Sequence, residues 1–599
     1  MLAAYRWQDV RRGGIVRVTA ASLAAAAFAA VLLGASEQAP ESPPLAPVAA
    51  PVKAPPTIPA PSVATLPYAP SIYTIRFDHW TEADERGFGE FIAGIGQSDC
   101  HTVNTCLHGP GNPFRASDPE GIYFKSDCAD LPYVLRAYYA WKRGLPFSYV
   151  SVIEPRGHTR DIRYTRNGNE VVERKDVLSG SISGYELLEE LRDIISSATY
   201  RMHPDLDAPA PDLYSPAINA KSIVPGTVIY DPNGHLATIY RVDPDGRIGY
   251  IDAHPDNSLT RGFYDLRFVR ARPSMGAGFK RWRPATLVGA VRRDDGVLIG
   301  GHIVLARNKD IPDFSEVQFY GTGPRPTDDA NWNAGTFVLN KQPLDYYDYV
   351  RAVLAGGKLE FDPVKEVADL VDSNCADLHY RVDAVALAIS AGLSRQPQPD
   401  RLPSNIYGTD GDWETYSTPS RDARLKTAFK ELRDQAERFM KMYRAHDPKL
   451  KYAGPNLAAD LIATYDRHAA ACSIGYTNTS GAAVTFGYVE AQKRLFRMSF
   501  DPYHCIERRW GATDPAELAS CPDGAEKQAW YGAEQGLRNQ IERTYEAKMD
   551  FSLDVLKTPG PGKGVPVPPD IDVRGYLIRT LANPPASPNA LVTVPSALR

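Results

Sequence analysis

Three reactive residue types in this chain could together perform nucleophilic chemistry. Cys128 lies in the segment Ser-Asp-Cys-Ala-Asp-Leu, His235 follows a glycine at the start of an apolar stretch, and Asp252 lies in Ile-Asp-Ala at the end of the next one. A thiol attacks as its thiolate, so it needs a base to take its proton, and a carboxylate can orient that base. We therefore predict Cys128 as nucleophile, His235 as general base and Asp252 as orienting acid.

The residues that follow Cys128 predict the helix that would carry the nucleophile. Apolar residues recur every three or four positions over residues 131–141, which is the pattern of an amphipathic helix. A cap at Ser126 or Asp127 would place Cys128 in the first turn, where unpaired N–H groups favour an anion. Pro132 complicates this placement because it lacks an N–H, so either the first turn bends or the helix begins later.

The base and its carboxylate are expected on neighbouring strands of an antiparallel sheet. Short strands separated by turn residues are predicted at residues 226–230, 235–242 and 247–252. His235 begins the second of these strands and Asp252 ends the third, so the two side chains should lie within cross-strand reach. His254 is two residues further on and faces the same side, which makes it the alternative third member.

Further elements are predicted from the same patterns. Between the cysteine and the histidine we expect a strand, a hairpin around Asn167-Gly168 and a helix, at residues 147–153, 161–172 and 184–202. The second half is predicted to be mainly helical, with helices at residues 346–354, 363–391, 421–443, 457–471 and 526–549. Acidic and basic residues alternate from Arg424 to Lys441, which indicates a solvated helix face.

Two of these segments resemble a known superfamily. Gly-His-Leu-Ala-Thr-Ile-Tyr with the later Ile-Asp-Ala resembles the histidine hairpin of papain-like cysteine hydrolases of the NlpC and CHAP types. The stretch from Asp-Cys-Ala-Asp-Leu to Arg-Gly-Leu-Pro, residues 127–146, resembles the nucleophile helix of the transglutaminase-like branch. The resemblance covers residues 75–275 and implies an α+β fold, with the nucleophile helix packed on an antiparallel sheet. It also implies the roles given above to Cys128, His235 and Asp252. We expect no cofactor and no metal.

Two departures leave the branch of the superfamily open. The Ser-Gly that usually follows the NlpC cysteine is replaced by Ala129-Asp130, and the aromatic residue that often follows the transglutaminase histidine is absent. The oxyanion hole would combine the Cys128 N–H with an upstream donor. Tyr123 and Asp130 are the candidates for that donor or for support.

The cysteine count is odd, which gives Cys128 a reason to be the unpaired thiol. The other six cysteines can pair in an oxidising compartment, and their spacing favours Cys100 with Cys106, Cys505 with Cys521, and Cys375 with Cys472. Connectivity cannot be deduced from sequence alone. An alternative zinc cluster would use Cys100, His101, Cys106 and His108, although this spacing matches no standard zinc pattern.

The second half contains a short segment whose sequence is similar to that around Cys128. Residues 373–380 match residues 126–133 at six of eight positions, and an apolar-periodic stretch follows both. No histidine lies between residues 471 and 492, where a base at the equivalent spacing would fall. We therefore expect Cys375 to be structural.

The termini and the composition suggest an exported protein of several parts. Four arginines precede a charge-free run at residues 18–35, which indicates an export signal or a membrane anchor. The predicted parts are that segment, a Pro/Ala-rich linker, a catalytic domain, a helical domain of unknown role and a Pro-rich tail, at residues 1–36, 37–70, 71–295, 296–556 and 557–599. A net charge of −5 over 599 residues gives no support for nucleic-acid binding.

These observations predict an exported, periplasmic or otherwise extracytoplasmic cysteine amidase or peptidase. A peptide of cell-wall type is the expected substrate, and membrane attachment would be through the N-terminal segment. Two alternatives stay open. One is a catalytically silent binding or scaffold protein of the cell envelope with the same fold, and the other is a transglutaminase-like enzyme that transfers the acyl group to an amine.

Overall fold

The computed structural model describes residues 71–582, except residues 160, 271, 409–410, 417–418, 544–548 and 559. All of the described residues belong to a single compact unit. The predicted export segment, the linker and the end of the Pro-rich tail therefore lie outside the described residues. Among the residues that are described, no helix is both long and apolar enough to span a bilayer.

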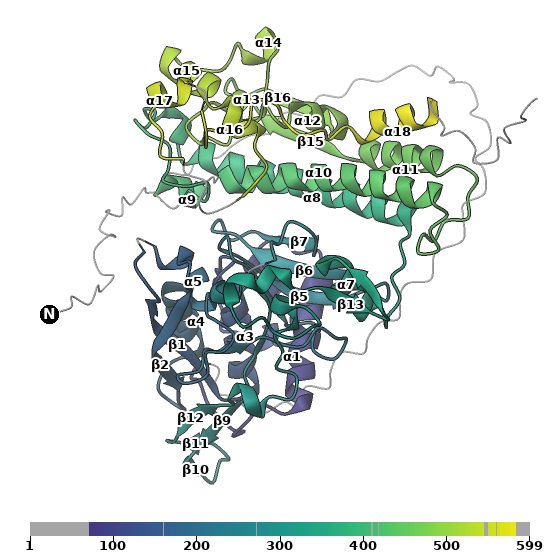
Figure 1. The fold of residues 1–599 in the computed structure, drawn as a ribbon. Coiled ribbons are helices and arrows are strands. Elements are labelled where there is room, and N and C mark those ends of the chain that lie inside the picture. The colour runs from purple at the N-terminus through teal and green to yellow at the C-terminus, as the bar shows by residue number, and fades with distance from the viewer. Residues whose placement is uncertain are drawn as a thin grey trace, which may run out of the picture. The chain divides into compact units, whose positions relative to one another are not determined.

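The N-terminal half is mixed α+β and is built around a six-stranded antiparallel sheet (Figure 1). Its strands follow the order β3-β8-β4-β5-β6-β7. Their bounds are Leu213–Tyr214 for β3, Val228–Asp231 for β4, His235–Val242 for β5, Ile248–Ala253 for β6, Leu259–Phe263 for β7 and Gly278–Trp282 for β8. Strands β4, β5 and β6 are the three strands predicted around the histidine and the aspartate.

Different helices cover the two faces of this sheet. Along β5, Leu236 belongs to the core formed with α1 (Glu82–Gln97) and α3 (Leu131–Arg143). The next residue, Ala237, belongs to a second core on the opposite face, formed with α7 (Tyr346–Leu354). This alternation follows from the two-residue period of a strand. The sheet is thus buried on both sides at the position where His235 enters it.

The predicted hairpin at residues 161–172 is wrong. Strand β1 (Phe147–Pro155) pairs instead with β2 (Asn169–Val177), and the residues between them form a connection that contains a short 3-10 turn. The buried Asn169 side chain donates hydrogen bonds to the carbonyls of Ile162 and Ala198, both at 2.9 Å. These bonds hold the connection against a neighbouring helix, so Asn167-Gly168 cannot close a tight hairpin.

The predicted helix at residues 184–202 is divided into α4 (Gly184–Ile194) and α5 (Ser197–Tyr200). Ile195 leaves the helical conformation, and the Ser196 side chain then accepts the Ala198 N–H as the cap of a new helix. A serine that caps favours such a restart over continuation of the first helix.

The C-terminal region is mainly helical, as predicted. Its longest helices, α8 (Pro363–Ser390), α10 (Pro419–Arg444) and α11 (Leu457–Ala471), pack side by side (Figure 1). A helix expected at residues 526–549 appears instead as α15 (Ala525–Ala533) and α16 (Gln535–Asn539). Gly536 contacts the backbone near Lys563, and its carbonyl accepts the Val565 N–H at 2.9 Å. This bond to a distant segment replaces one that a continuous helix would make.

Part of the Pro-rich C-terminal segment is ordered as α18 (Val573–Ala582), which packs on α10 and α11. Val573 and Leu577 are fully buried there. The remaining helices are α2 (Val103–His108), α6 (Val317–Tyr320), α9 (Asp412–Tyr416), α12 (Tyr488–Arg494), α13 (Ile506–Arg509), α14 (Pro515–Leu518) and α17 (Leu553–Lys557). The remaining strands are β9 (Ala285–Val288), β10 (Val291–Arg292), β11 (Leu298–Ile299), β12 (His302–Leu305), β13 (Phe337–Leu339), β14 (Gln342–Leu344), β15 (Ser473–Thr477) and β16 (Ala483–Gly487).

Three disulfides join the cysteine pairs that the spacing favoured. They link Cys100 to Cys106, Cys375 to Cys472 and Cys505 to Cys521. Cys128 is the one free cysteine. The Cys100–Cys106 bond uses two of the four ligands of the alternative zinc cluster, so that alternative is wrong.

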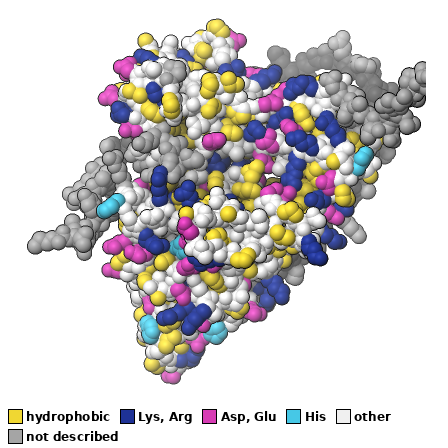
Figure 2. Space-filling model, viewed as in Figure 1, with side chains coloured by type: hydrophobic (Ala, Val, Ile, Leu, Met, Phe, Trp, Pro, Cys, Tyr) yellow, Lys and Arg dark blue, Asp and Glu magenta, His cyan; other side chains and the backbone are white. Residues whose placement is uncertain are grey.

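On the face drawn in Figure 2, basic and acidic side chains are interspersed, and no single-sign patch covers it.

Candidate active site

Cys128 lies on a tight turn immediately before α3. The Asp127 carboxylate accepts the N–H groups of Ala129 and Asp130 at 2.7 and 3.2 Å, and the Asp130 carboxylate accepts the Asp127 N–H at 3.0 Å. These reciprocal bonds fix the turn on both sides of the cysteine. The helix itself begins at Leu131, so the placement of Cys128 in its first turn is wrong and the later start is right. Pro132 lacks the N–H that would have bonded back to Cys128.

The backbone around Cys128 offers a free donor. Within the described chain, the Cys128 N–H makes no hydrogen bond, so it remains available to an oxyanion. The candidates for support lie in different surroundings. Asp130 is buried in the turn, whereas Tyr123 is 48% exposed and does not line the cavity described below.

His235 and Asp252 form a direct pair. Nε2 of His235 lies 2.7 Å from one carboxylate oxygen of Asp252, and the Thr260 hydroxyl donates to the other oxygen. The hairpin register sets Thr238 opposite Ile251, so His235 reaches Asp252 along a diagonal rather than directly across. Nδ1 of His235 bonds to nothing in the described residues, which leaves it as the proton acceptor.

His254 is bound at the edge of the same network. Its Nε2 lies 3.0 Å from the Thr260 hydroxyl and 3.8 Å from Asp252, and its ring stacks on Tyr380 of α8 with 4.3 Å between centroids. The two histidines are therefore linked by a chain of hydrogen bonds that runs from His254 to the Thr260 hydroxyl, from there to the Asp252 carboxylate, and from the carboxylate to His235. Asp252 contacts His235 more closely than it contacts His254, so the geometry favours the aspartate as the third member.

The Cys128 sulfur lies beside the strand that carries the histidine. The backbone N–H of Leu236, the residue after His235, is near enough to lower the pKa of the Cys128 thiol. No hydrogen bond joins the sulfur to the His235 ring anywhere in the described structure. Hydrogen bonds between catalytic groups are commonly long before substrate binds. The three predicted residues thus line one site, but in the described structure the Cys128 sulfur and the His235 ring are not hydrogen-bonded to each other.

Burial and local charge keep both reacting groups neutral. Burial, together with the charge of Asp127, raises the pKa of the Cys128 thiol, although the Leu236 N–H opposes this. Burial, together with the positive charge of Arg424, lowers the pKa of His235 to about 3. Asp252 is buried, yet the two histidines and Thr260 hold the pKa of its carboxyl below the usual range. At neutral pH these shifts favour a neutral thiol, a neutral imidazole and an ionised Asp252 carboxyl.

A cavity of about 230 Å³ opens onto these residues. One side is formed by the Cys128 turn and the ends of β5 and β6, and the other by side chains from α8 and α10, including Tyr380 and Arg424. The solvated face predicted from Arg424 to Lys441 is wrong in part. Lys426 and Glu431 of this helix are buried, and Arg424 lines the cavity, because α10 packs between neighbours on several sides.

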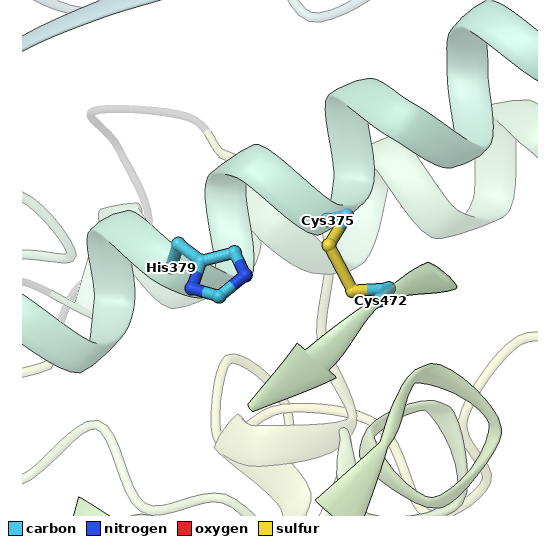
Figure 3. Close-up of side chains that lie close together, drawn as sticks. All are labelled: Cys375, His379 and Cys472. Atoms are coloured by element: carbon cyan, nitrogen blue, oxygen red, sulfur yellow. A yellow bond between two sulfur atoms is a disulfide. The ribbon is translucent and has the colours of Figure 1, made fainter. Parts of the chain in front are cut away.

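The second Cys-Ala-Asp-Leu segment has a different local structure. Cys375 lies in the middle of α8 and is bonded to Cys472, with His379 one turn further along the helix (Figure 3). Both sulfurs are in the disulfide, so neither is a nucleophile or a thiolate ligand. Two residues of the same segment nevertheless reach the cavity, namely Asp377 and Tyr380. Sequence patterns gave no signal for this role.

One further cluster of ligand-type side chains is fully buried. Asp501, His504 and Glu534 lie close enough together to share an ion. Both ring nitrogens of His504 are already engaged, Nδ1 with the Ser499 hydroxyl at 2.7 Å and Nε2 with the Lys527 carbonyl at 3.0 Å. We interpret this cluster as a structural hydrogen-bond network.

Comparison with known proteins adds no relative: no family model matches the chain, and no curated protein or solved structure is detectably similar to it. The function must therefore be argued from the geometry of the site.

Proposed function

We propose that the protein is an exported or membrane-tethered cysteine hydrolase with a papain-like domain, and that it cleaves an amide bond of a peptide through Cys128, His235 and Asp252. The observation that carries this proposal is the 2.7 Å pair of His235 and Asp252 in the cavity that also holds the free cysteine. The three disulfides support an oxidising compartment.

The proposed reaction follows from which atoms are free. The Cys128 sulfur attacks the carbonyl carbon while its proton passes to Nδ1 of His235, and Asp252 stabilises the imidazolium that forms. The Cys128 N–H donates to the developing oxyanion. The carbon–nitrogen bond then breaks, the amine leaves with the proton from His235, and a thioester remains. Water, deprotonated by His235, hydrolyses the thioester and restores the thiol.

The size of the cavity bears on the substrate. A volume of about 230 Å³ is below the usual range for small-molecule pockets, which begins at about 300 Å³. It suits one or two residues of a peptide rather than a long segment. A cell-wall-type peptide is the proposed substrate class.

The test is substrate turnover by purified protein without its first 70 residues. We expect Cys128→Ala to lower turnover of a cell-wall-type peptide by at least about a thousandfold, since the nucleophile and base act as a unit. His302→Ala is the matched histidine control, because this exposed residue lies outside the cavity. Full activity of Cys128→Ala would overturn the hydrolase. Repeating the assay with an added amine separates hydrolysis from acyl transfer.

A silent scaffold is the second candidate, favoured by one observation. The pKa of the Cys128 thiol is raised and the thiol makes no hydrogen bond to His235, which is poor activation for a nucleophile. A scaffold would bind the peptide without turnover, and Cys128→Ala would leave its affinity unchanged.

A further inference from the structure

Arg424 is the arginine of the cavity that has no ion-pair or hydrogen-bond partner among the described residues. The Nη1 atom of Arg424 is enclosed, and in the described chain its guanidinium forms no ion pair and no hydrogen bond. Its closest aromatic contact is loose, with 5.6 Å between the guanidinium carbon and the Phe268 ring centroid. An unpaired buried charge is costly unless a partner arrives, because its desolvation is not compensated.

Each of the other arginines that line the cavity has at least one polar partner; Arg421 bonds to the Tyr416 carbonyl and Arg509 to the Ser499 carbonyl. Arg163 pairs with Asp161 and with Glu414. Arg381 makes two hydrogen bonds of 3.0 Å to the Asp422 carboxylate. Further pairings are Arg267 with Asp265 and Asp377, and Arg261 with the carbonyls of Gly96, Cys100 and Ile95. Arg424 therefore differs from these arginines in having its whole donor set available.

The acidic side chains of the cavity are also engaged. Asp127 accepts two N–H groups of the cysteine turn, and Asp252 is held by His235 and Thr260. The remaining carboxylates are the arginine partners named above, Asp377, Glu414 and Asp422. Asp377 acts on Arg424 only through its charge, and no described carboxylate of the cavity forms an ion pair or a hydrogen bond with the Arg424 guanidinium.

Resting on the proposed function, we propose that Arg424 is the anion-binding residue of this cavity and that the substrate carries a carboxylate close to the bond that Cys128 attacks. A planar guanidinium with a free fork binds a carboxylate through two parallel hydrogen bonds. The charge of Arg424 also acts on His235, whose pKa it lowers, which agrees with a location beside the reacting groups. An acidic side chain or a free C-terminal carboxylate of a peptide meets this requirement.

The test compares two alkylating reagents of nearly equal size, iodoacetate and iodoacetamide, at Cys128. For each reagent, the alkylation rate of Cys128 is first divided by the rate at which the same reagent alkylates N-acetylcysteine at the same pH. The ratio that is compared between variants is this relative rate for iodoacetate divided by the relative rate for iodoacetamide. Both reagents need the same thiolate, so this ratio cancels any change in the thiol pKa. We expect the wild-type ratio to fall about tenfold in Arg424→Gln, because a charge-assisted contact is lost.

Two further variants make this experiment specific. Arg424→Lys keeps the charge without the planar fork, so we expect an intermediate ratio. Arg163→Gln removes one positive charge from the same cavity, but that charge is already paired, so we expect the ratio to stay within about twofold of wild type. An equal fall in Arg163→Gln, or an unchanged ratio in Arg424→Gln, would overturn the assignment.

A binding measurement tests the same assignment if the alkylating reagents cannot reach the Cys128 sulfur. In the Cys128→Ala background, calorimetry should show tighter binding of N-acetylglutamate than of N-acetylglutamine, and Arg424→Gln should abolish that preference. Equal affinities before the substitution, or a preference that survives it, count against Arg424. Neither readout depends on peptide turnover, so an inactive protein would refute the hydrolase without deciding the role of Arg424.

Discussion

At the scale of single residues, the pKa shifts favour a protonated Cys128 thiol beside a neutral His235 ring. The pKa of Cys128 is raised by burial and by the charge of Asp127, while the pKa of His235 is lowered to about 3 by burial and by Arg424. A preformed thiolate–imidazolium pair would need the opposite shifts. In the proposed reaction, the imidazole therefore takes the thiol proton during the attack rather than before it.

The pH dependence of alkylation tests this interpretation. Because the pKa of folded Cys128 lies above that of a free thiol, its iodoacetamide rate should rise about tenfold per pH unit from pH 7 to pH 10. The unfolded chain should level off above about pH 9, where an ordinary thiol is ionised. Mass spectrometry of timed reactions gives both profiles. A folded-state rate that is flat between pH 6 and pH 8 would show an ion pair instead.

At the scale of elements, the turn before α3 and the β5–β6 hairpin position the reacting groups. The turn depends on the two aspartates on either side of Cys128, and the hairpin brings His235 to Asp252 across 17 residues of sequence. Asp127 has two separable effects. Its oxygen accepts two backbone N–H groups, and its charge raises the pKa of the thiol.

Two substitutions at Asp127 should separate these effects. Asp127→Asn keeps an accepting oxygen and removes the charge, so we expect nearly unchanged stability and faster alkylation of Cys128 at neutral pH. Asp127→Ala also removes the acceptor and should lower the free energy of unfolding by about 1–2 kcal/mol. Denaturant unfolding and the alkylation profile measure the two quantities. Equal loss of stability in both variants would contradict this division.

At the scale of the whole molecule, the helical region completes the cavity. Helix α8 supplies Tyr380, which stacks on His254, and α10 supplies Arg424. The Cys375–Cys472 disulfide ties the middle of α8 to the end of α11 and closes a loop of 97 residues. Because longer loops lose more entropy when they are closed in the unfolded chain, this bond should stabilise the fold most.

Removing disulfides should therefore give unequal effects. We expect the double variant Cys375→Ala/Cys472→Ala to lose about 4–5 kcal/mol of unfolding free energy, and the six-residue Cys100–Cys106 loop to cost about half as much when both its cysteines become alanine. Urea unfolding of the two double variants measures the difference. Equal losses would argue that α8 and α11 are held by packing alone.

Local patterns in the sequence were sufficient for much of the site. The strand around His235, the strand that ends near Asp252 and the free status of Cys128 follow from two-residue periodicity, turn residues and an odd cysteine count. These are short-range signals, and a hairpin converts them directly into a contact. The β1–β2 pairing was missed because the buried side chain of Asn169 bonds to carbonyls on other segments, and no local pattern records that.

Only the tertiary structure decided what surrounds the triad. In the sequence, Arg424 belongs to a run of alternating charges, and Asp377 belongs to the second segment that resembles the sequence around Cys128. Packing of α8 and α10 turns both side chains into the cavity, where Asp377 has an arginine partner and Arg424 bonds to none of the described residues. Helical periodicity defines a face but not what that face will meet, because the partner lies hundreds of residues away. The sequence by itself was sufficient to predict which cysteine, histidine and aspartate share a site, because turns and strand periodicity are local signals, whereas only long-range packing decided which charged side chains line the cavity around them.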